Sequence, residues 1–519
     1  MHRRTFLCGS AAATAGLLLT RRSTMTAMPK SLPPDATIEA LSQLALDAAR
    51  RAGASYADIR VSRHRSQNIS TRERQVQWTS DADSFGFGLR LLVDGAWGFA
   101  ANSIVTKGAI LKGVETAVAI ARANATLQRE PVRLASTPAW NASWKTPIEI
   151  NPFDVPLQEK VDLLLAINTE MLKTNGVRFC ESSLFQTSEE KFFASTEGTV
   201  LHQEIFRIWP SYEATAVSDD GTDFQSCSGF TAPMGQGYEY LKEFPLMEDA
   251  RRAGRDAAAK LKAEPITNGR RDLVLMPSHL WLVIHESIGH ATELDRALGF
   301  EANYAGTSFV TTDNLGKLEY ASPIVHVVGD RTERHGLATV GFDDDGVKAR
   351  RFDIIRGGRF VGYQTTREQA HWVGGTESRA CSYADSYASV PMQRMPNISL
   401  MPSSTVTAPQ DLIAGIDDGV LIHGDGSWSI DQQRRNFQFG GQIFSRIKGG
   451  KIDGMYRDVA FQAMTLDFWR SCDAICSKEH YALGGSYWCG KAQPGQIAPV
   501  SHGSSPARFR NVTFINTAR

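Results

Sequence analysis

Residues 277–295 read PSHLWLVIHESIGHATELD. Positions 280–284 are all apolar, and a helix that is apolar on every side is one enclosed by protein. Ser278 is suited to cap the start of this helix and Gly299 to end it. Two histidines and a glutamate stand in this apolar setting, where each of them needs a partner or a metal ion. The stretch therefore predicts a buried helix with reactive side chains.

The two histidines, His285 and His290, are five positions apart in the pattern HExxxH. The familiar zinc-protease pattern HExxH separates them by four, which leaves both on one helix face. At about 100° per residue, the longer spacing turns the second histidine about 140° from the first. Both reach one ion only if the helix contains a π-bulge, a distortion typical of functional sites. Gly289, which is permissive in its dihedral angles, lies where the bulge would fall.

Further motifs are spread over the chain, and with HESIGHATELD they resemble the TldD family. This family is the catalytic half of the bacterial TldD/TldE (also called TldD/PmbA) metalloprotease. The motifs occur in family order: a glycine-rich hairpin at 86–99, GFDDDG at 341–346, RMPN at 394–397, and WCGKAQPGQ with PV at 488–500.

The resemblance implies one Zn²⁺ per active subunit, ligated by His285, His290 and the distant Cys489. Three protein ligands leave a fourth position for water, and a thiolate beside imidazoles suits zinc. Glu286 would be the general base that takes a proton from the metal-activated water and later protonates the leaving amine.

Other motif residues leave alternatives open. Arg394 and Asn397 either hold substrate backbone or are structural residues at strand ends. Cys472 and Cys476 are spaced for a disulfide or a second metal, although few histidines lie near them. The three aspartates at 343–345 could bind calcium, but a following glycine favours a hairpin turn.

The first 27 residues have the form of an export signal: a basic start, a short apolar stretch over 6–19, and small residues. Adjacent arginines at positions 3 and 4, followed by Thr-Phe-Leu, resemble the twin-arginine signal of folded bacterial proteins. We expect cleavage after Ala27 and a periplasmic location. The apolar stretch is shorter than the roughly 20 residues of a membrane span, so we expect no span in the mature protein.

Composition narrows the classes of protein. Of 519 residues, 42% are hydrophobic and 22% charged, as in ordinary globular proteins. Lys+Arg and Asp+Glu both number 56, so no basic excess indicates a nucleic-acid partner, and we expect none. The seven cysteines are too few for a disulfide scaffold.

Periodicity and turn dipeptides predict an α+β protein. We place an N-terminal domain of mixed helices and strands at residues 28–268. A β-rich, mostly antiparallel C-terminal domain that carries the HExxxH helix follows at 269–519. The predicted elements are helices near 35–53, 105–124, 156–173 and 248–262; hairpins at 87–100, 352–363 and 443–456; and a long surface connection at 131–156.

The sequence thus favours a zinc-dependent peptidase of the TldD type that cleaves unfolded or short flexible peptides. The resemblance also implies a homodimer, or a heterodimer with a TldE/PmbA-like subunit that lacks the HExxxH motif. Two rivals use the same residues: a peptide-binding or scaffold subunit with a structural metal, and a metal-dependent hydrolase of another amide or ester.

Overall fold

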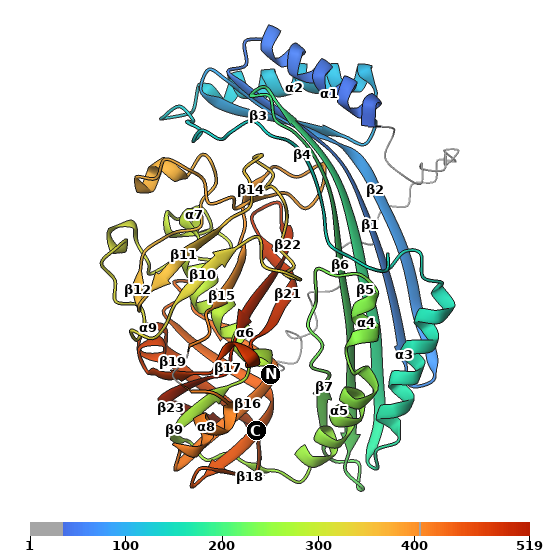
Figure 1. Cartoon of the computed structure of the whole chain (residues 1–519), viewed down its shortest axis with the longest axis vertical. Helices are drawn as coiled ribbons and strands as arrows, with labels where there is room; N and C mark the ends of the chain where they lie inside the picture. The colour runs from blue at the N-terminus through green and yellow to red at the C-terminus, as the bar shows by residue number, and fades with distance from the viewer. Residues whose placement is uncertain (1–34, 404–405, 519) are drawn as a thin grey trace, which may run out of the picture.

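The computed structural model describes residues 35–403 and 406–518. The predicted export signal at 1–27 lies outside these residues. The chain forms a long curved sheet with helices at both ends, and a β-rich C-terminal body that lies against the concave side of that sheet (Figure 1). The α+β class, with mostly antiparallel strands in the C-terminal part, is confirmed.

The long sheet has the strand order β3-β2-β1-β5-β6-β4, with β7 paired to β6. At the β2–β3 turn, Asp94 and Gly95 have φ angles of 53° and 77°, so the predicted hairpin with its tight turn is present. The predicted connection at 131–156 contains a strand that was not foreseen, β4, which pairs in parallel with β6. The strands are β1 (Tyr56–Arg72), β2 (Gln75–Val93), β3 (Ala96–Asn102), β4 (Asn141–Lys145), β5 (Val177–Ser195), β6 (Val200–Val217) and β7 (Phe224–Ser228).

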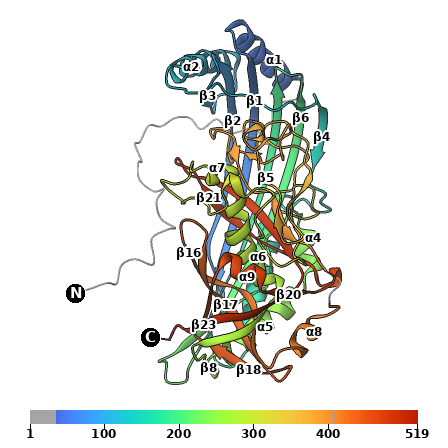
Figure 2. The same cartoon turned by 90° about the vertical axis from the view of Figure 1, so that its left-hand side faces the viewer.

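The four predicted helices are confirmed, and they cover the two ends of this sheet (Figures 1 and 2). At one end, α1 and α2 share an apolar core with β1, β2 and β3. At the other end, α3 and α5 pack with β5 and β6. The helices are α1 (Asp35–Arg51), α2 (Lys107–Ala125), α3 (Leu157–Leu172), α4 (Glu239–Glu243) and α5 (Leu246–Lys260).

The C-terminal body is built on a sheet with the order β16-β9-β23-β19-β17-β18-β8, to which β20 adds through β23. The predicted hairpins at 352–363 and 443–456 are present as β11–β12 and β17–β18. Its strands are β8 (Glu264–Pro265), β9 (Gly269–Leu275), β16 (Asp418–Ile430), β17 (Asn436–Lys448), β18 (Lys451–Arg457), β19 (Val459–Met464), β20 (Cys472–Ile475) and β23 (Ala507–Asn516).

Smaller sheets complete this body: β12-β11-β10-β15, β13-β14 and β21-β22. Their bounds are β10 (Val327–Asp330), β11 (Arg351–Arg356), β12 (Arg359–Phe360), β13 (Ser382–Tyr383), β14 (Met392–Gln393), β15 (Asn397–Leu400), β21 (Ala482–Lys491) and β22 (Gln496–Ser504), with short helices α8 (Pro409–Ala414) and α9 (Thr465–Arg470).

The quoted helix, α6 (Pro277–Ile284), runs through the centre of the C-terminal body. It packs against β16 on one side and the β21–β22 hairpin on another. Leu280, Val283 and Ile284 are fully buried in the largest apolar core. After α6 the backbone forms a distorted helical turn, His285–Gly289, and then a short 3₁₀ turn, His290–Thr292. The helical segment is completed by α7 (Leu294–Ala297). The enclosure predicted from the apolar run is confirmed.

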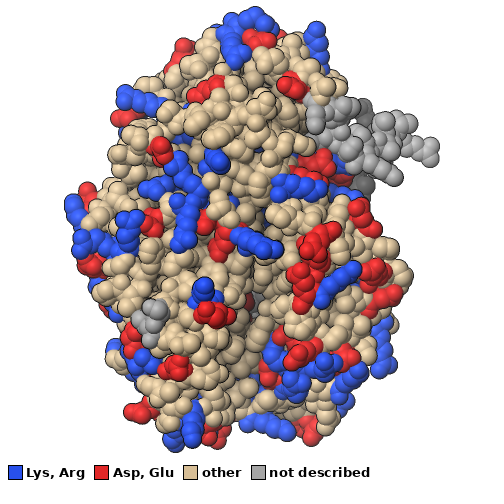
Figure 3. Space-filling view, in the orientation of Figure 1, with Lys and Arg blue, Asp and Glu red and all other residues tan. Residues whose placement is uncertain are grey.

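No helix within the described ranges is long and apolar enough to cross a membrane. On the face seen in Figure 3, basic and acidic side chains are interspersed.

Candidate metal centre

The segment that follows α6 is a π-helical turn, His285–Gly289. The backbone N–H of His290 donates to the carbonyl oxygen of His285, a hydrogen bond that spans five residues instead of four. As a result the two imidazole rings lie on the same side, with centroids 4.6 Å apart and planes at 78°. The π-bulge predicted from the spacing is confirmed. A Cβ atom on Gly289 would lie 2.6 Å from Sδ of the buried Met395, so a larger residue there would have to displace that side chain.

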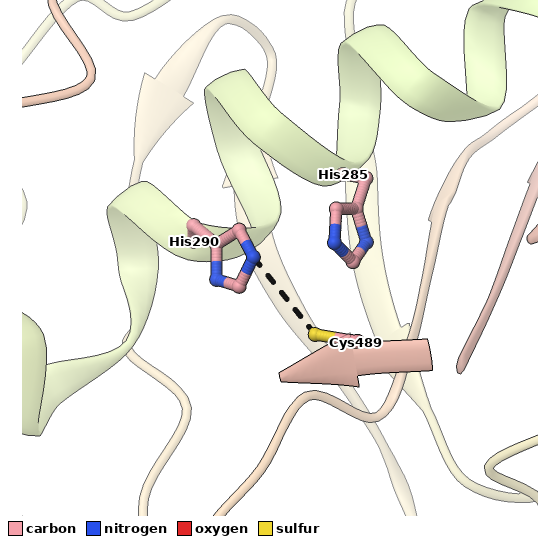
Figure 4. Close-up of side chains that lie close together, drawn as sticks. All are labelled: His285, His290 and Cys489. Carbon is pink, nitrogen blue, oxygen red and sulfur yellow. Dashed lines mark hydrogen bonds between the residues drawn. The ribbon is translucent and has the colours of Figure 1, made fainter. Parts of the chain in front are cut away.

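Cys489 reaches the two histidines from β21 (Figure 4). Its Sγ lies 3.9 Å from Nε2 of His290. The ligand atoms of His285, His290 and Cys489 all lie within 4.8 Å of one another, and all three side chains are buried. The thiol is 199 positions from His290 in the sequence, so only the tertiary fold brings the three together.

Hydrogen bonds fix the tautomer of His285. Nδ1 of His502 lies 2.9 Å from the carbonyl oxygen of Ile398, and because a carbonyl only accepts, Nδ1 is the donor. Burial holds the pKa of His502 well below its ordinary value, so the ring is neutral and its Nε2 accepts. Nδ1–H of His285, 2.7 Å away, therefore donates to it. This leaves the Nε2 lone pair of His285 for a metal.

His290 has the same arrangement with a carboxylate. Its Nδ1 lies 2.9 Å from Oε2 of Glu293 and donates to it, so its Nε2 is also left as a lone pair. Glu293 is held by Arg296, at 2.9 Å, and by Lys491, at 3.1 Å. Burial opposes the charge of Glu293, but Lys491 and Arg296 outweigh it and hold its pKa well below the ordinary range. Burial also lowers the pKa of His290, which favours the neutral ring that metals bind.

The electrostatics of Cys489 favour a thiolate. Burial acts to raise the pKa of the Cys489 thiol, but opposing influences, of which the Arg394 guanidinium is the largest, outweigh it, and the pKa is lowered. A thiolate is the form in which cysteine ligates metals.

Arg394 and Asn397, predicted as possible substrate contacts, are used inside the protein. Arg394 is buried and donates to the backbone oxygens of Cys489 and Gln496, which ties the two strands of the β21–β22 hairpin together. The buried Asn397 donates to the Asp330 carbonyl oxygen at 2.8 Å and accepts from two backbone N–H groups. Internal contacts of this kind are what the structural alternative describes.

Glu286 lies beside the three ligand residues. Nη1 of Arg434 donates to its Oε2 at 2.9 Å, and Nη2 of the same guanidinium donates to the Ala305 carbonyl oxygen. Both charged side chains are buried. Arg434 has a φ of 65°, a backbone conformation that is uncommon outside glycine.

A cavity of about 710 Å³ opens over the site. His285, Glu286, His290 and Cys489 all line it, and so do residues 228–233, which begin at the end of β7. The reactive groups are therefore buried in the protein but accessible from the cavity.

The residues present fit a zinc ion. Two Nε2 lone pairs and one thiolate converge, each imidazole is oriented by a partner at its Nδ1, and this donor set suits Zn²⁺ with an open position. Within residues 35–403 and 406–518 this is the one group of three or more such side chains that converges. Cys472 and Cys476 are both buried free thiols, so the alternatives of a disulfide or a second metal for them are not supported.

Some partners in this site were not found from the sequence. Glu293 could have been found, because it lies three positions after His290, and this spacing brings side chains together on a helical turn. His502 and Arg434 carry no such local signal, because each reaches the site from a distant strand or turn.

Comparison with known proteins places the whole architecture. Residues 57–121 match domain 1, residues 150–263 the central domain, and residues 268–516 the C-terminal domain of the PmbA/TldA metallopeptidases. The chain belongs to the PmbA/TldD family. All residues of the metal centre lie within the match to the C-terminal domain.

Three PmbA/TldD relatives show the extent of the likeness. A metalloprotease of Methanothermobacter thermautotrophicus is 28% identical over 460 residues, 88% of this chain and 94% of that protein. A zinc metalloprotease TldD homologue of Saccharolobus solfataricus is 21% identical over 479 residues, covering 89% and 97%. The crystal structure of TldE from Thermococcus kodakarensis superposes with a TM-score of 0.71 at 16% identity, covering 92% of this chain and 99% of that one, and shows the same fold.

Proposed function

We propose that this chain is the catalytic, TldD-like subunit of a zinc-dependent peptidase. The observation that carries the proposal is the convergence of two Nε2 atoms and one thiolate beside the Glu286 carboxylate, in the wall of a cavity. A relative named as a zinc metalloprotease supports the choice of metal.

His285, His290 and Cys489 would hold the ion, which when bound supplies a Lewis acid for the scissile carbonyl and for the attacking water. Glu286 accepts a proton from that water and returns it to the leaving amine. Arg434 keeps the Glu286 carboxylate oriented towards the cavity. An acid–base role explains why a carboxylate is kept beside the ligands, since a structural metal site has no need of one.

An extended peptide fits the cavity best. A space of about 710 Å³ admits a stretch of chain and not a folded domain. Within the described chain β21 pairs only with β22, and residues 482–490 of β21 line the cavity. A peptide added along the free edge of β21 would form backbone hydrogen bonds and pass directly over Cys489. Unfolded or short flexible peptides are therefore the proposed substrates.

We also propose that the working unit is a dimer, either of two copies or with a TldE-like chain. Residues 75–84 of β2 are exposed and pair only with β1 among the described strands, which leaves an open edge suited to a partner. The fold that this chain shares with TldE is compatible with a related partner. A periplasmic location by twin-arginine export remains part of the proposal and rests on the sequence of residues 1–27.

The decisive test replaces Glu286 by glutamine and measures both bound zinc and peptide cleavage. We expect zinc to be retained and cleavage to fall by roughly 10²–10⁴-fold, the contribution of a positioned general base. Glu319→Gln, at an exposed position in the same body, serves as the matched control and should change neither. Undiminished cleavage by Glu286→Gln would exclude Glu286 as the base.

The two rivals give different results. A scaffold subunit with a structural metal binds peptides, but the unaltered protein cleaves none, with or without a chelator. A hydrolase of another amide or ester spares peptides but turns over a member of a substrate screen, and Glu286→Gln abolishes that turnover.

A further inference from the structure

The cavity over the metal centre has an unusual lining. Six aromatic side chains face it: Trp209, Phe230, Trp281, Trp428, Tyr487 and Trp488. Two carboxylates also line it, Glu286 and Asp425. Among the residues that the structure describes, no lysine or arginine lines this cavity. Aromatic faces and carboxylates both attract cations, so the wall is matched to a positively charged ligand.

Asp425 differs from Glu286 in having no protein cation beside it. Glu286 forms an ion pair with Arg434. No ion pair is formed by Asp425 with any basic side chain in the described ranges, and its side chain is open to the cavity. The pairing of β16 with β17 is irregular between Asp425 and Trp428, where the strand passes the cavity.

Asp425 is an exposed residue of the cavity wall and lies close to Trp281. Nearby protein raises the pKa of its carboxyl group, and hydrogen bonding by its own backbone and by the Trp281 side chain opposes that rise. A cation bound in the cavity would supply the counter-ion that no basic side chain of the described residues supplies.

Asp425 also lies near the reactive centre. Its neighbour Trp281 precedes His285 by four residues on α6, about 6 Å along a helix axis, and the two rings have centroids 6.3 Å apart. A residue of an extended peptide spans about 3.3 Å. A group paired with Asp425 would therefore belong to a residue only a few positions from the scissile bond.

We propose that this cavity selects peptides with a cationic group close to the cleaved bond, which pairs with Asp425 among the indole rings of Trp281 and Trp428. The group is an alkylammonium or guanidinium, supplied by the peptide N-terminus or by a lysine or arginine side chain. The inference rests on the proposed peptidase function for its biological meaning, but the recognition itself is a property of Asp425 and its surroundings.

Binding to zinc-loaded Glu286→Gln protein tests the inference without turnover. The probes are acetylated, otherwise neutral hexapeptides that carry lysine or norleucine at each position in turn, and one neutral peptide with a free or acetylated N-terminus. We expect either lysine at one position or the free N-terminus to tighten binding by about tenfold, the strength of a charge-assisted hydrogen bond. The two arms distinguish a side chain from an N-terminus as the source.

Adding Asp425→Asn to that protein should abolish the preference, and Asp425→Glu should retain part of it. The matched control is Asp418→Asn, the same change at the far end of β16, where the carboxylate pairs with Arg271 outside the cavity. Equal binding of charged and neutral peptides, or a preference that survives Asp425→Asn in a variant with normal zinc content, would overturn the inference.

The results distinguish failure of this inference from failure of the proposed peptidase function. If the unaltered protein cleaves no peptide but still binds cationic peptides through Asp425, the peptidase proposal fails and the recognition stands. If it cleaves peptides without regard to charge, the peptidase proposal stands and the recognition fails.

Discussion

The C-terminal body contains two buried clusters of residues that can ligate metals, and the two clusters differ in whether the protein itself supplies their partners. In the metal centre, His285, His290 and Cys489 direct their ligand atoms at a common point. In the turn at 343–345, three buried aspartates follow one another. Basic side chains from the first sheet form ion pairs with two of them. Arg90 pairs with Asp345 at 2.6 Å.

The remaining two aspartates are also satisfied. Lys191 pairs with Asp344 at 3.2 Å. Asp343 accepts hydrogen bonds from the backbone N–H groups of Asp345, Val347 and Ser382. Gly346, with a φ of 76°, closes the turn, so the hairpin alternative is confirmed and the calcium alternative is not supported.

The difference shows what turns such a cluster into a metal site. The residues in both places are buried and belong to types that can ligate a metal. In the metal centre the protein places the hydrogen bonds of both imidazoles on their Nδ1 atoms, and the Nε2 and Sγ atoms converge on one another. In the aspartate turn the protein supplies its own cations. Four predictions test this contrast.

The largest effect should follow the loss of a ligand. Replacing His290 by alanine removes one of three donors, and we expect zinc affinity to fall by more than the roughly 10–100-fold typical of losing an outer partner. Metal content after dialysis against a weak chelator measures this. His480→Ala, which lines the same cavity outside the cluster, is the control and should retain zinc. Full zinc occupancy in His290→Ala would contradict the assignment of this ligand.

The aspartate turn should respond in stability and not in metal content. Asp345→Ala leaves the buried Arg90 with Asp58 as its remaining carboxylate partner, so we expect a loss of about 3 kcal/mol in unfolding free energy. Urea denaturation gives the stability, and elemental analysis should show unchanged zinc. Added calcium should leave the stability of the unaltered protein as it is. A rise with calcium would mean that the turn binds metal after all.

The sequence predicts the geometry of the metal centre better than the partners of the buried side chains, and the reason is physical. The π-turn follows from the spacing of His285 and His290, because a regular helix could not bring both rings to one side. The four helices and the hairpins likewise depend on local periodicity and turn residues. The partners Arg90 and His502 depend on pairings between strands far apart in the sequence, which no local pattern encodes. Whether a carboxylate or an imidazole is left free is therefore decided only by the tertiary fold.

A smaller effect should come from the partner of His285. His502→Ala removes the acceptor that fixes the imidazole tautomer, and we expect about tenfold weaker zinc binding. His502→Gln offers an amide oxygen in place of Nε2 and should recover part of the loss. Competition with a chromophoric chelator measures both. Equal affinities for the two variants would show that His502 acts by packing against Trp281 and not by hydrogen bonding.

The smallest effect concerns protons in the aspartate turn. Burial and the neighbouring Asp345 carboxylate raise the pKa of Asp343 to about 7, whereas an unfolded aspartate titrates near about 4. The folded state thus binds a proton that the unfolded chain has released. The stability from this group is full below about pH 4 and is lost as the pH rises towards 7, by up to about 1.4 kcal/mol per pH unit.

Asp343→Asn removes this titration. The informative quantity is therefore how the difference in unfolding free energy between the two proteins changes with pH, and not its value at any one pH. Between pH 5 and pH 7 the unfolding free energy of the unaltered protein should fall relative to the variant by about 1 kcal/mol per pH unit, and the difference should level off above that range. Urea denaturation at a series of pH values measures it. A difference independent of pH would mean that the backbone N–H groups around Asp343 stabilise its charge as fully as water does. Such a result would extend the contrast with the metal centre, because the turn would then need neither a proton nor a metal ion to keep three carboxylates buried.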